Sequence, residues 1–179
     1  MDLTNHDETQ GQDLHGQLGA SLWDALKAAP RSRPLSRKLS TFAGGITEVT
    51  VIDDQQPGRS VNKYDLLCPR SECGSIILKS GVGAWVERES VQLEPADSPR
   101  HPLLPALPDP PQTTNWWLVT PSPMSFENIG FTHAVTSMGN TTEQMKLLAC
   151  AECEVGPLGW CMVGGTEFWV ACERVAYHL

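Results

Sequence analysis

Two pairs of closely spaced cysteines constrain the fold of this chain more than any other feature. The first pair is Cys68 and Cys73, in LLCPRSECGS, and the second is Cys150 and Cys153, in LLACAECEVG. Each pair follows a short apolar run that begins Leu-Leu, lies in a polar turn and has a glycine shortly after it. This pattern predicts two knuckles, each a hairpin turn that presents two thiolates on one side. Together they would complete a closed tetrahedral site, which is structural because it leaves no position open for water.

These cysteines have two other interpretations. The four thiols could be buried without a metal, although paired spacing in two separate turns argues against it. A redox C-x-x-C pair normally begins a helix in a βαβ setting, whereas Gly156 to Gly159 reads Gly-Pro-Leu-Gly and does not start one. We therefore predict one zinc ion held by Cys68, Cys73, Cys150 and Cys153.

The composition of the chain changes near residue 45. Residues 1–45 are rich in Gln, Asp, Gly and Ser, which predicts a disordered tail. One short helix is possible there, because apolar residues recur at helical spacing at Leu18, Leu22, Trp23 and Leu26. Residues 46–179 are predicted to form the zinc-binding domain, with its core from Val61 onward. Ile46 to Ile52 alternates β-branched and polar residues, as a half-buried strand does.

Short apolar runs separated by Gly and Pro make up the rest of the chain, in YDLLC, SIILKS, AWVERESVQL, NWWLVT, MKLLAC and EFWVACERVAY. Most are too short for helices and rich in β-branched and aromatic residues, so we predict a mostly β domain of about seven short strands. Ala96 to Asn115 is dense in proline and is predicted to be a long surface loop. Trp116 and Trp117 should point to opposite faces of a strand, so we expect only one in the core. Cys161 and Cys172 are predicted to be small core side chains.

The charge of the chain restricts its partners. The formal net charge is −8, and from Val61 onward 13 acidic residues face 7 basic ones. This balance argues against nucleic acid and favours a basic protein partner. No apolar run is long enough to span a membrane. The first residues are acidic and polar, the opposite of a secretory signal, so we expect a reducing cytosolic environment.

Four stretches occur in the order NWWLV, FENIGFT, LLACAECEVGPLGW and FWVACERV. Together they closely resemble the Rab interacting factor family, also written Mss-four, whose members are small zinc proteins that act on Rab GTPases of the secretory pathway. The likeness runs from about Leu66 to Val175, and the longer first turn, C-x4-C, is similar to that of fungal members. The resemblance implies a mostly β fold of several short curled antiparallel sheets around one structural zinc.

The resemblance also implies an activity. Family members bind Rab GTPases without nucleotide, promote release of GDP or GTP, and act as slow exchange factors or chaperones for the empty GTPase. Their Rab-contacting surface lies around the zinc site and the central strands. At the matching positions of this chain the contacts would be Trp117, Phe126, Glu127, Asn128, Gly130, Phe131 and Glu152. Thr120 to Ser125 has no carboxylate, although family members commonly have an aspartate there.

The residue types suit that activity. A GTPase binds its phosphates with N–H groups, a lysine and a magnesium ion, so an emptied pocket is positive and unsatisfied. A partner that stabilises the empty state should present carboxylates and large apolar anchors, and Glu152 and Glu154 lie in and beside the second knuckle. Exchange of this kind needs no nucleophile or general base, so we expect a regulator of a small GTPase and not an enzyme.

Two rival functions make different demands. B-type methionine sulfoxide reductases resemble this fold and carry zinc on two cysteine pairs, but they need a reactive cysteine in an electropositive site, and Cys172 lies in an alternating apolar run. A nucleic-acid-binding zinc ribbon needs a basic face. We therefore expect a cytoplasmic monomer that serves vesicle transport, binds no nucleic acid and reaches secretory-pathway membranes through its Rab.

Overall fold

The structure is a computed structural model that describes residues 35–95, 97–99, 101–137 and 140–179. All described residues belong to one compact unit, Arg33–Leu179. The helix expected around Leu18 to Leu26 and most of the predicted tail lie outside the described residues.

Thirteen strands are found in the described part of the chain, and all their pairings are antiparallel. This confirms the mostly β prediction, although the strands are more numerous and shorter than the seven expected. The strands are β1 (Ser36–Lys38), β2 (Thr50–Ile52), β3 (Ser60–Asn62), β4 (Leu66–Leu67), β5 (Ile76–Leu78), β6 (Ala84–Glu89), β7 (Thr113–Val119), β8 (Ile129–Phe131), β9 (Val135–Ser137), β10 (Asn140–Cys150), β11 (Gly159–Met162), β12 (Phe168–Ala171) and β13 (Ala176–His178). The helical turns are η1 (Leu39–Thr41), α2 (Ile46–Val49), η2 (Pro123–Ser125) and η3 (Cys172–Arg174).

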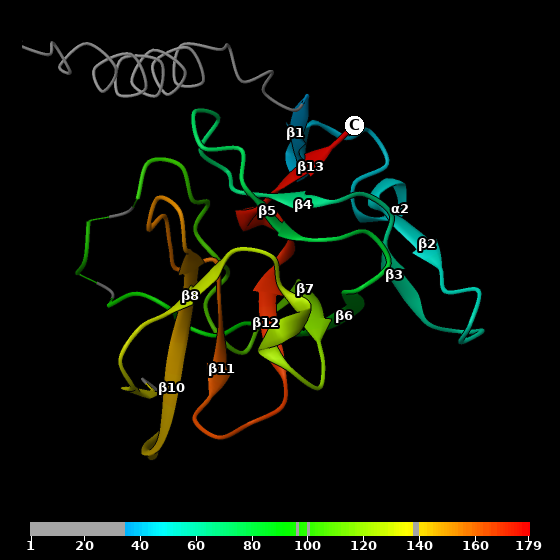
Figure 1. The fold of residues 1–179 in the computed structure, drawn as a ribbon. Helices are drawn as coiled ribbons and strands as arrows, with labels where there is room; N and C mark the ends of the chain where they lie inside the picture. Colours follow the sequence, from blue (N-terminus) through cyan, green and yellow to red (C-terminus); the bar gives the residue numbers. More distant parts are fainter. Residues whose placement is uncertain (1–34, 96, 100, 138–139) are drawn as a thin grey trace, which may run out of the picture. The chain divides into compact units, whose positions relative to one another are not determined.

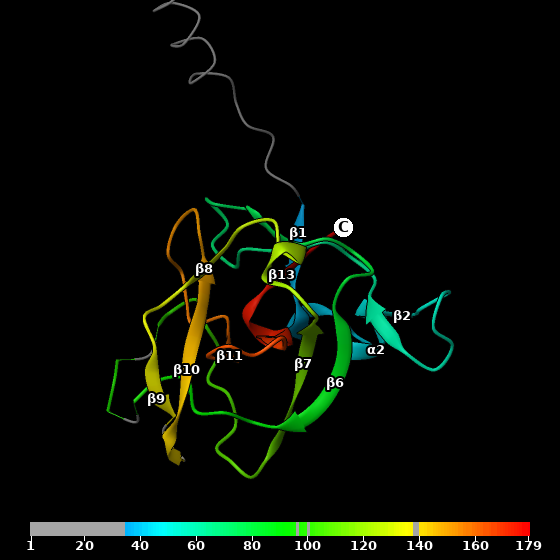
Figure 2. The same cartoon turned by 60° about the horizontal axis from the view of Figure 1, so that its bottom comes forward.

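These strands form two sheets. The smaller has the order β1-β13-β4-β5, and the larger has the order β2-β3-β6-β7-β12-β11-β10-β8, with β9 paired to β10. In Figure 1 the small sheet lies above the centre of the large one. Figure 2 shows the large sheet curling from β10 on one side, through β11 and β7, to β6 and β2 on the other. The expectation of short curled antiparallel sheets is therefore confirmed.

The large sheet is covered by apolar side chains on both faces. Trp117 belongs to the main core cluster, together with Phe168, Val170 and Tyr177. Trp116 belongs to a second cluster with Leu93, Met145, Trp160, Trp169 and Ala171. Adjacent residues of β7 point to opposite faces as expected, yet both tryptophans are fully buried. The prediction that only one would be core is wrong, because the segment before β7 covers the second face.

That covering segment is the proline-dense stretch between β6 and β7. Leu93 and Leu104 are buried, and Val91 and Leu107 pack against the second cluster. The buried Arg174 fastens the segment, because its guanidinium makes two hydrogen bonds to the Glu94 carboxylate, at 2.7 and 3.0 Å. The predicted surface loop is thus partly a cover for the core, and its last residues, from Thr113, already belong to β7.

The start of the domain also differs from the prediction. Ile46–Val49 forms the short helix α2 and only Thr50–Ile52 is a strand. Threonine side chains support this helical turn, since the Thr47 hydroxyl donates to the carbonyl of Gly44 and the Thr50 hydroxyl to that of Ile46. Upstream, β1 pairs with β13, and Leu39 and Phe42 are buried. The folded domain therefore begins before residue 46, within the predicted tail.

The C-terminal stretch EFWVACERVAY joins the two sheets. The chain leaves the large sheet at the end of β12, turns through η3 and enters the small sheet as β13. Tyr177 of β13 connects the two sheets by hydrogen bonds. Its hydroxyl donates to the carbonyl of Cys172 at 2.8 Å and accepts from Nε1 of Trp117, in β7, at 3.2 Å. Cys161 and Cys172 are buried, as predicted.

Candidate metal centre and its flanking surface

The first knuckle is the turn between β4 and β5. The N–H of Cys68 donates to the carbonyl of Ser75 at 2.8 Å, which closes the hairpin. The N–H groups of Cys73 and Gly74 both donate to the carbonyl of Arg70, at 3.0 and 3.1 Å. Gly74 has a φ of 59°, a left-handed conformation that glycine adopts without steric cost. The turn therefore directs both sulfurs to one side.

The second knuckle follows directly from the end of β10. Cys150 donates its N–H to the carbonyl of Val155 at 2.9 Å, and the N–H of Glu154 returns to the carbonyl of Cys150 at 2.8 Å. Glu154 has a φ of 61°, the same conformation as Gly74 in the first knuckle. Gly156 allows the chain to leave the turn, because a Cβ at that position would lie 2.7 Å from the Cβ of Ala149. No helix begins at this pair, as the sequence predicted.

The two knuckles bring their four sulfurs together. The Sγ atoms of Cys68 and Cys153 are 3.5 Å apart, those of Cys73 and Cys150 are 3.8 Å apart, and all four lie within 4.8 Å of one another. A tetrahedral ion with metal–sulfur bonds of about 2.3 Å requires sulfur–sulfur distances of about 3.8 Å. The donor set and its spacing therefore fit one metal ion. Cys68 and Cys150 are buried in the main core cluster, whereas Cys73 and Cys153 are half-buried at its edge.

The thiols experience different surroundings. Burial raises the pKa of Cys68 and of Cys150. The backbone N–H of Arg70 opposes this effect at Cys68 by favouring the thiolate. The N–H groups of Cys153 and Glu152 do the same at Cys150. Burial also opposes ionisation of Cys73, but hydrogen bonds from the hydroxyl and N–H of Ser75 outweigh it and lower its pKa to about 7. N–H groups directed at sulfur stabilise thiolate ligands. Ser75 is not among the predicted site residues, although its position two residues after Cys73 could have indicated it.

The remaining cysteines offer no comparable environment. Burial raises the pKa of Cys161, and it raises that of Cys172 far more, because this thiol is enclosed in the core. A thiol that stays protonated is a poor nucleophile. This setting disfavours the reductase alternative.

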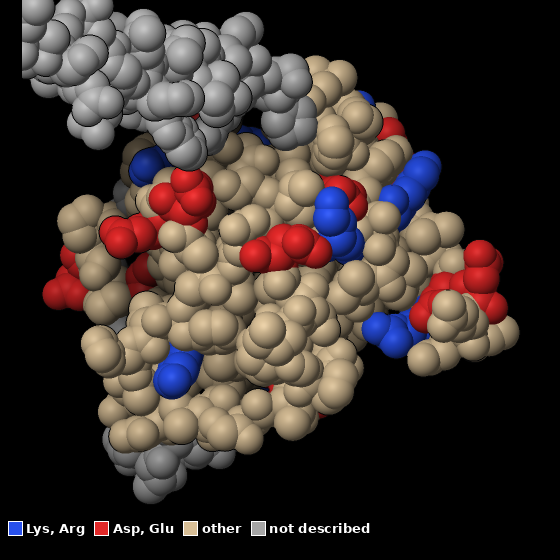
Figure 3. All heavy atoms as spheres, in the orientation of Figure 1, with Lys and Arg blue, Asp and Glu red and all other residues tan. Residues whose placement is uncertain are grey.

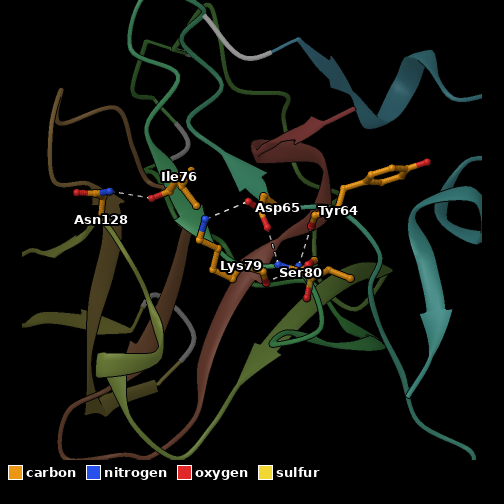
Figure 4. A network of polar contacts seen from close by, with 7 residues as sticks. Tyr64, Asp65, Ile76, Lys79, Ser80 and Asn128 are labelled. Carbon is orange, nitrogen blue, oxygen red and sulfur yellow. Dashed lines mark hydrogen bonds and ion pairs between the residues drawn. The ribbon is translucent and has the colours of Figure 1, made fainter. Parts of the chain in front are cut away.

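The segment FENIGF lies between the two knuckles. The N–H of Glu127 donates to the carbonyl of Ile77 in β5 at 3.0 Å, and β8 pairs with β10 so that Ile129 lies opposite Cys150. Asn128 turns its side-chain amide toward β5 and donates to the carbonyl of Ile76 at 3.0 Å (Figure 4). Of the contact residues that the resemblance implied, Glu152 and those in Phe126–Phe131 thus lie next to the four cysteines, whereas Trp117 lies in β7 between β6 and β12.

The exposure of those residues corrects two of them. Trp117 is fully buried and Phe126 nearly so, because both pack inside the main core cluster. Neither side chain lies on a surface, so we remove both from the candidate contacts. Glu127 and Glu152 are exposed, Asn128 and Gly130 are half-buried, and Phe131 retains 39% of its surface. Phe131 stands edge-on against the ring of Phe168 at 6.0 Å, which fixes it as a rigid apolar edge.

The charges around the site are predominantly acidic. Glu127, Glu152 and Glu154 are exposed beside the second knuckle, and Glu72 is exposed in the first. In Figure 3 acidic side chains gather over the end of the domain that carries the first knuckle, β5 and the loop after β10. The neighbouring part of this face, over β8 and β12, is largely uncharged. An acidic rim next to an apolar surface is suited to a protein partner with a basic, partly apolar face.

The fold and site define a class of protein: a small antiparallel β domain in which two cysteine knuckles from distant parts of the chain converge, with four sulfurs that could hold one metal ion. A family model described as "Mss4 protein" matches residues 61–177, and the chain belongs to this family. It is 30% identical over 116 residues to the "Guanine nucleotide exchange factor MSS4 homolog" of Drosophila melanogaster, a match that covers 65% of this chain and 85% of that relative. Among the residues that the structure describes, no helix is long and apolar enough to cross a membrane.

Proposed function

We propose that this protein binds Rab-type small GTPases in their nucleotide-free state and promotes nucleotide release in vesicle transport. The proposal rests on the match to the Mss4 family over residues 61–177, which include all four cysteines of the site. The name of the Drosophila relative, a guanine nucleotide exchange factor, supports it. The protein would act as an exchange factor or as a chaperone of the empty GTPase. We place it in the cytoplasm as a monomer that meets membranes through its Rab.

We propose zinc as the metal. Four thiolates in a closed tetrahedral arrangement suit Zn²⁺, and such sites are structural. When bound, the ion would supply no reaction chemistry and would join the two knuckles rigidly. Cys68 and Cys150 would anchor it in the core, and Cys73 and Cys153 would face the flanking surface.

The surface beside the second knuckle would meet the GTPase. Glu127 and Glu152 offer exposed carboxylates, which complement the positive pocket left by phosphates and Mg²⁺. Phe131 and Met124 supply apolar area, and Met124 is 87% exposed. Met124 lies in Thr120 to Ser125, the segment that lacks a carboxylate, so we assign this part of the contact to apolar packing. Aromatic residues and methionine are enriched at such interfaces.

Exchange follows from linkage and requires no covalent step. A nucleotide with a nanomolar dissociation constant has about −12 kcal/mol of binding free energy. A factor that prefers the empty GTPase weakens nucleotide binding by its preference, and returning nucleotide releases the factor by the same coupling. Side chains that are already rigid in the free factor lose little conformational freedom on binding, so they strengthen its binding to the empty GTPase.

Binding to a panel of Rab GTPases tests the proposal. Each GTPase is offered in GDP-loaded and nucleotide-free form, and retention on the immobilised protein is compared. We expect at least one GTPase to be retained much more strongly without nucleotide, and its release of a fluorescent GDP analogue to accelerate. Equal retention of both forms across the whole panel would refute the function.

A further inference from the structure

Asn128 is hydrogen-bonded to both halves of the metal site. Its side-chain Nδ2 donates to the carbonyl of Ile76 at 3.0 Å, on the strand that leaves the first knuckle. Its backbone carbonyl accepts from the N–H of Ala151 at 3.3 Å, inside the second knuckle. Figure 4 shows the amide directed at Ile76. One residue therefore connects two turns that are 77 or more residues apart in sequence.

Two exposed side chains of the same segment contrast with the half-buried Asn128. Glu127 and Phe131 are exposed, whereas Asn128 is half-buried. The backbone of Glu127 is bonded to Ile77, and β8 is paired with the end of β10. Among the described residues, the Asn128 amide makes the only side-chain hydrogen bond between the segment Phe126–Phe131 and β5. Its donor is committed inward and does not point to a partner.

We propose that Asn128 is a positioning residue, which holds the segment Phe126–Phe131 between the knuckles so that Glu127, Phe131 and Glu152 form one surface. This inference rests on the proposed function for its consequence in GTPase binding. The metal would fix the four sulfurs with respect to one another, but none of the ligands belongs to this segment. Backbone bonds to Ile77 and to β10 hold the main chain of the segment, and the Asn128 side chain adds a further connection to β5, on the strand that leaves the first knuckle.

Substitution of Asn128 tests the inference in the full chain with its metal bound. Asn128→Asp replaces the donor by a carboxylate, which cannot donate when ionised and faces the Ile76 carbonyl. We expect the amides of Glu127 and Ala151 to exchange with solvent roughly tenfold faster in the free protein, because losing the hydrogen bond loosens the segment locally. We also expect the dissociation constant for a nucleotide-free Rab to rise roughly tenfold. Asn128→Ala removes the donor without adding charge and serves if the aspartate variant does not fold.

The metal content of the variants serves as an internal control, because the substitutions alter none of the four cysteines. Metal content should stay at one ion per chain, and the absorption bands of the cobalt-substituted protein should be unchanged, since no ligand is altered. Asn128→Gln keeps an amide donor and should recover part of the protection and affinity. Asn115→Asp is the matched control, because the Asn115 amide oxygen only accepts, from Nε1 of Trp85 at 3.0 Å, and a carboxylate can still do so. We expect it to behave like the native protein in every measurement.

Two results would overturn the inference. The first is native-like exchange at Glu127 and Ala151 in both the aspartate and alanine variants, which would show that the amide does not hold the segment. The second is faster exchange with unchanged affinity for the GTPase. If the native protein itself showed no preference for an empty Rab, the proposed function would fail, while the exchange rates of the free variants would still decide whether Asn128 positions the segment.

Discussion

The two knuckles each present a pair of cysteine sulfurs, but they do so with different turns. Four residues separate the cysteines of the first and two separate those of the second. In both, the residue after the second cysteine has left-handed backbone and donates its N–H back into the turn, but it is Gly74 in the first and Glu154 in the second. A side chain in this conformation costs on the order of 1 kcal/mol. The first knuckle thus has the residue that its backbone favours, whereas the second keeps an exposed carboxylate there.

The knuckles also differ in how they are anchored. The hairpin of the first is closed at its base by Asp65, whose carboxylate accepts from the N–H of Ser80 at 2.8 Å and pairs with Lys79 at 3.2 Å (Figure 4). The second is bonded directly to the segment that carries exposed Glu127 and Phe131, because the N–H of Ala151 donates to the backbone carbonyl of Asn128. From this difference we expect the first knuckle to stabilise the site and the second to contact the partner. Four predictions test this comparison.

Removal of the metal should have the largest effect and should affect both knuckles alike. Chelation is expected to destabilise the domain by roughly 5 kcal/mol or more, because metal binding contributes directly to folding free energy. Cys150→Ser should abolish metal binding, whereas Cys161→Ser, at a buried cysteine outside the site, should leave one ion per chain. Metal analysis and thermal unfolding with and without chelator measure this. An unfolding temperature that chelator does not change would disprove a structural metal.

Charge reversal should separate the knuckles. Glu152→Lys is expected to weaken binding to a nucleotide-free Rab by roughly tenfold to a hundredfold, because like charges at an interface are strongly unfavourable. Glu72→Lys makes the same change in the first knuckle and should have a much smaller effect. Isothermal titration calorimetry at two salt concentrations would measure both. Equal losses from the two variants would show that the second knuckle has no special role.

Exchanging the left-handed residues should change stability in opposite directions. Gly74→Glu is expected to lower the free energy of unfolding by about 1–2 kcal/mol, since it introduces a side chain at positive φ. Glu154→Gly should raise it by up to about 1 kcal/mol and at the same time weaken Rab binding. Urea denaturation gives the stabilities. If Glu154→Gly left the affinity for the GTPase intact, the strained glutamate would have no function in binding.

The anchor of the first hairpin should contribute least. Hydrogen bonding to Ser80 and the charge of Lys79 outweigh the effect of burial and lower the pKa of Asp65. A lowered pKa stabilises the fold above the carboxyl group's unfolded pKa, and this contribution is lost as the pH falls through the folded value. Asp65→Asn should therefore cost less than about 1 kcal/mol at neutral pH, and the difference from the native protein should vanish in acid. Denaturation at neutral and acidic pH would measure the difference in stability between the variant and the native protein. A difference that persists in acid would argue against an ionic origin.

Local patterns predicted the parts of this protein that depend on neighbours in sequence. The knuckles were recognisable because cysteine spacing, polar turns and glycines act over a few residues. The β character was visible for the same reason, in short runs of β-branched and aromatic residues. The prediction was wrong for Ile46–Val49, because its β-branched composition indicated a strand. Threonine hydroxyls that donate to the carbonyls of Gly44 and Ile46 stabilise a helical turn there instead. The single stretch EFWVACERVAY became two strands because η3 carries the chain from one sheet to the other.

The sequence by itself determined which four cysteines converge, the class of fold and the acidic character of the flanking surface, since residue types and spacing are sufficient for each. Only the tertiary structure decided which side chains reach that surface. Trp117 and Phe126 lie inside because two layers close over them, and Trp116 is buried because a proline-rich segment covers the opposite face. Asn128 points inward to a carbonyl 52 residues away in the chain. Burial and long-range hydrogen bonds depend on what packs against a residue, and that is settled only when distant segments meet.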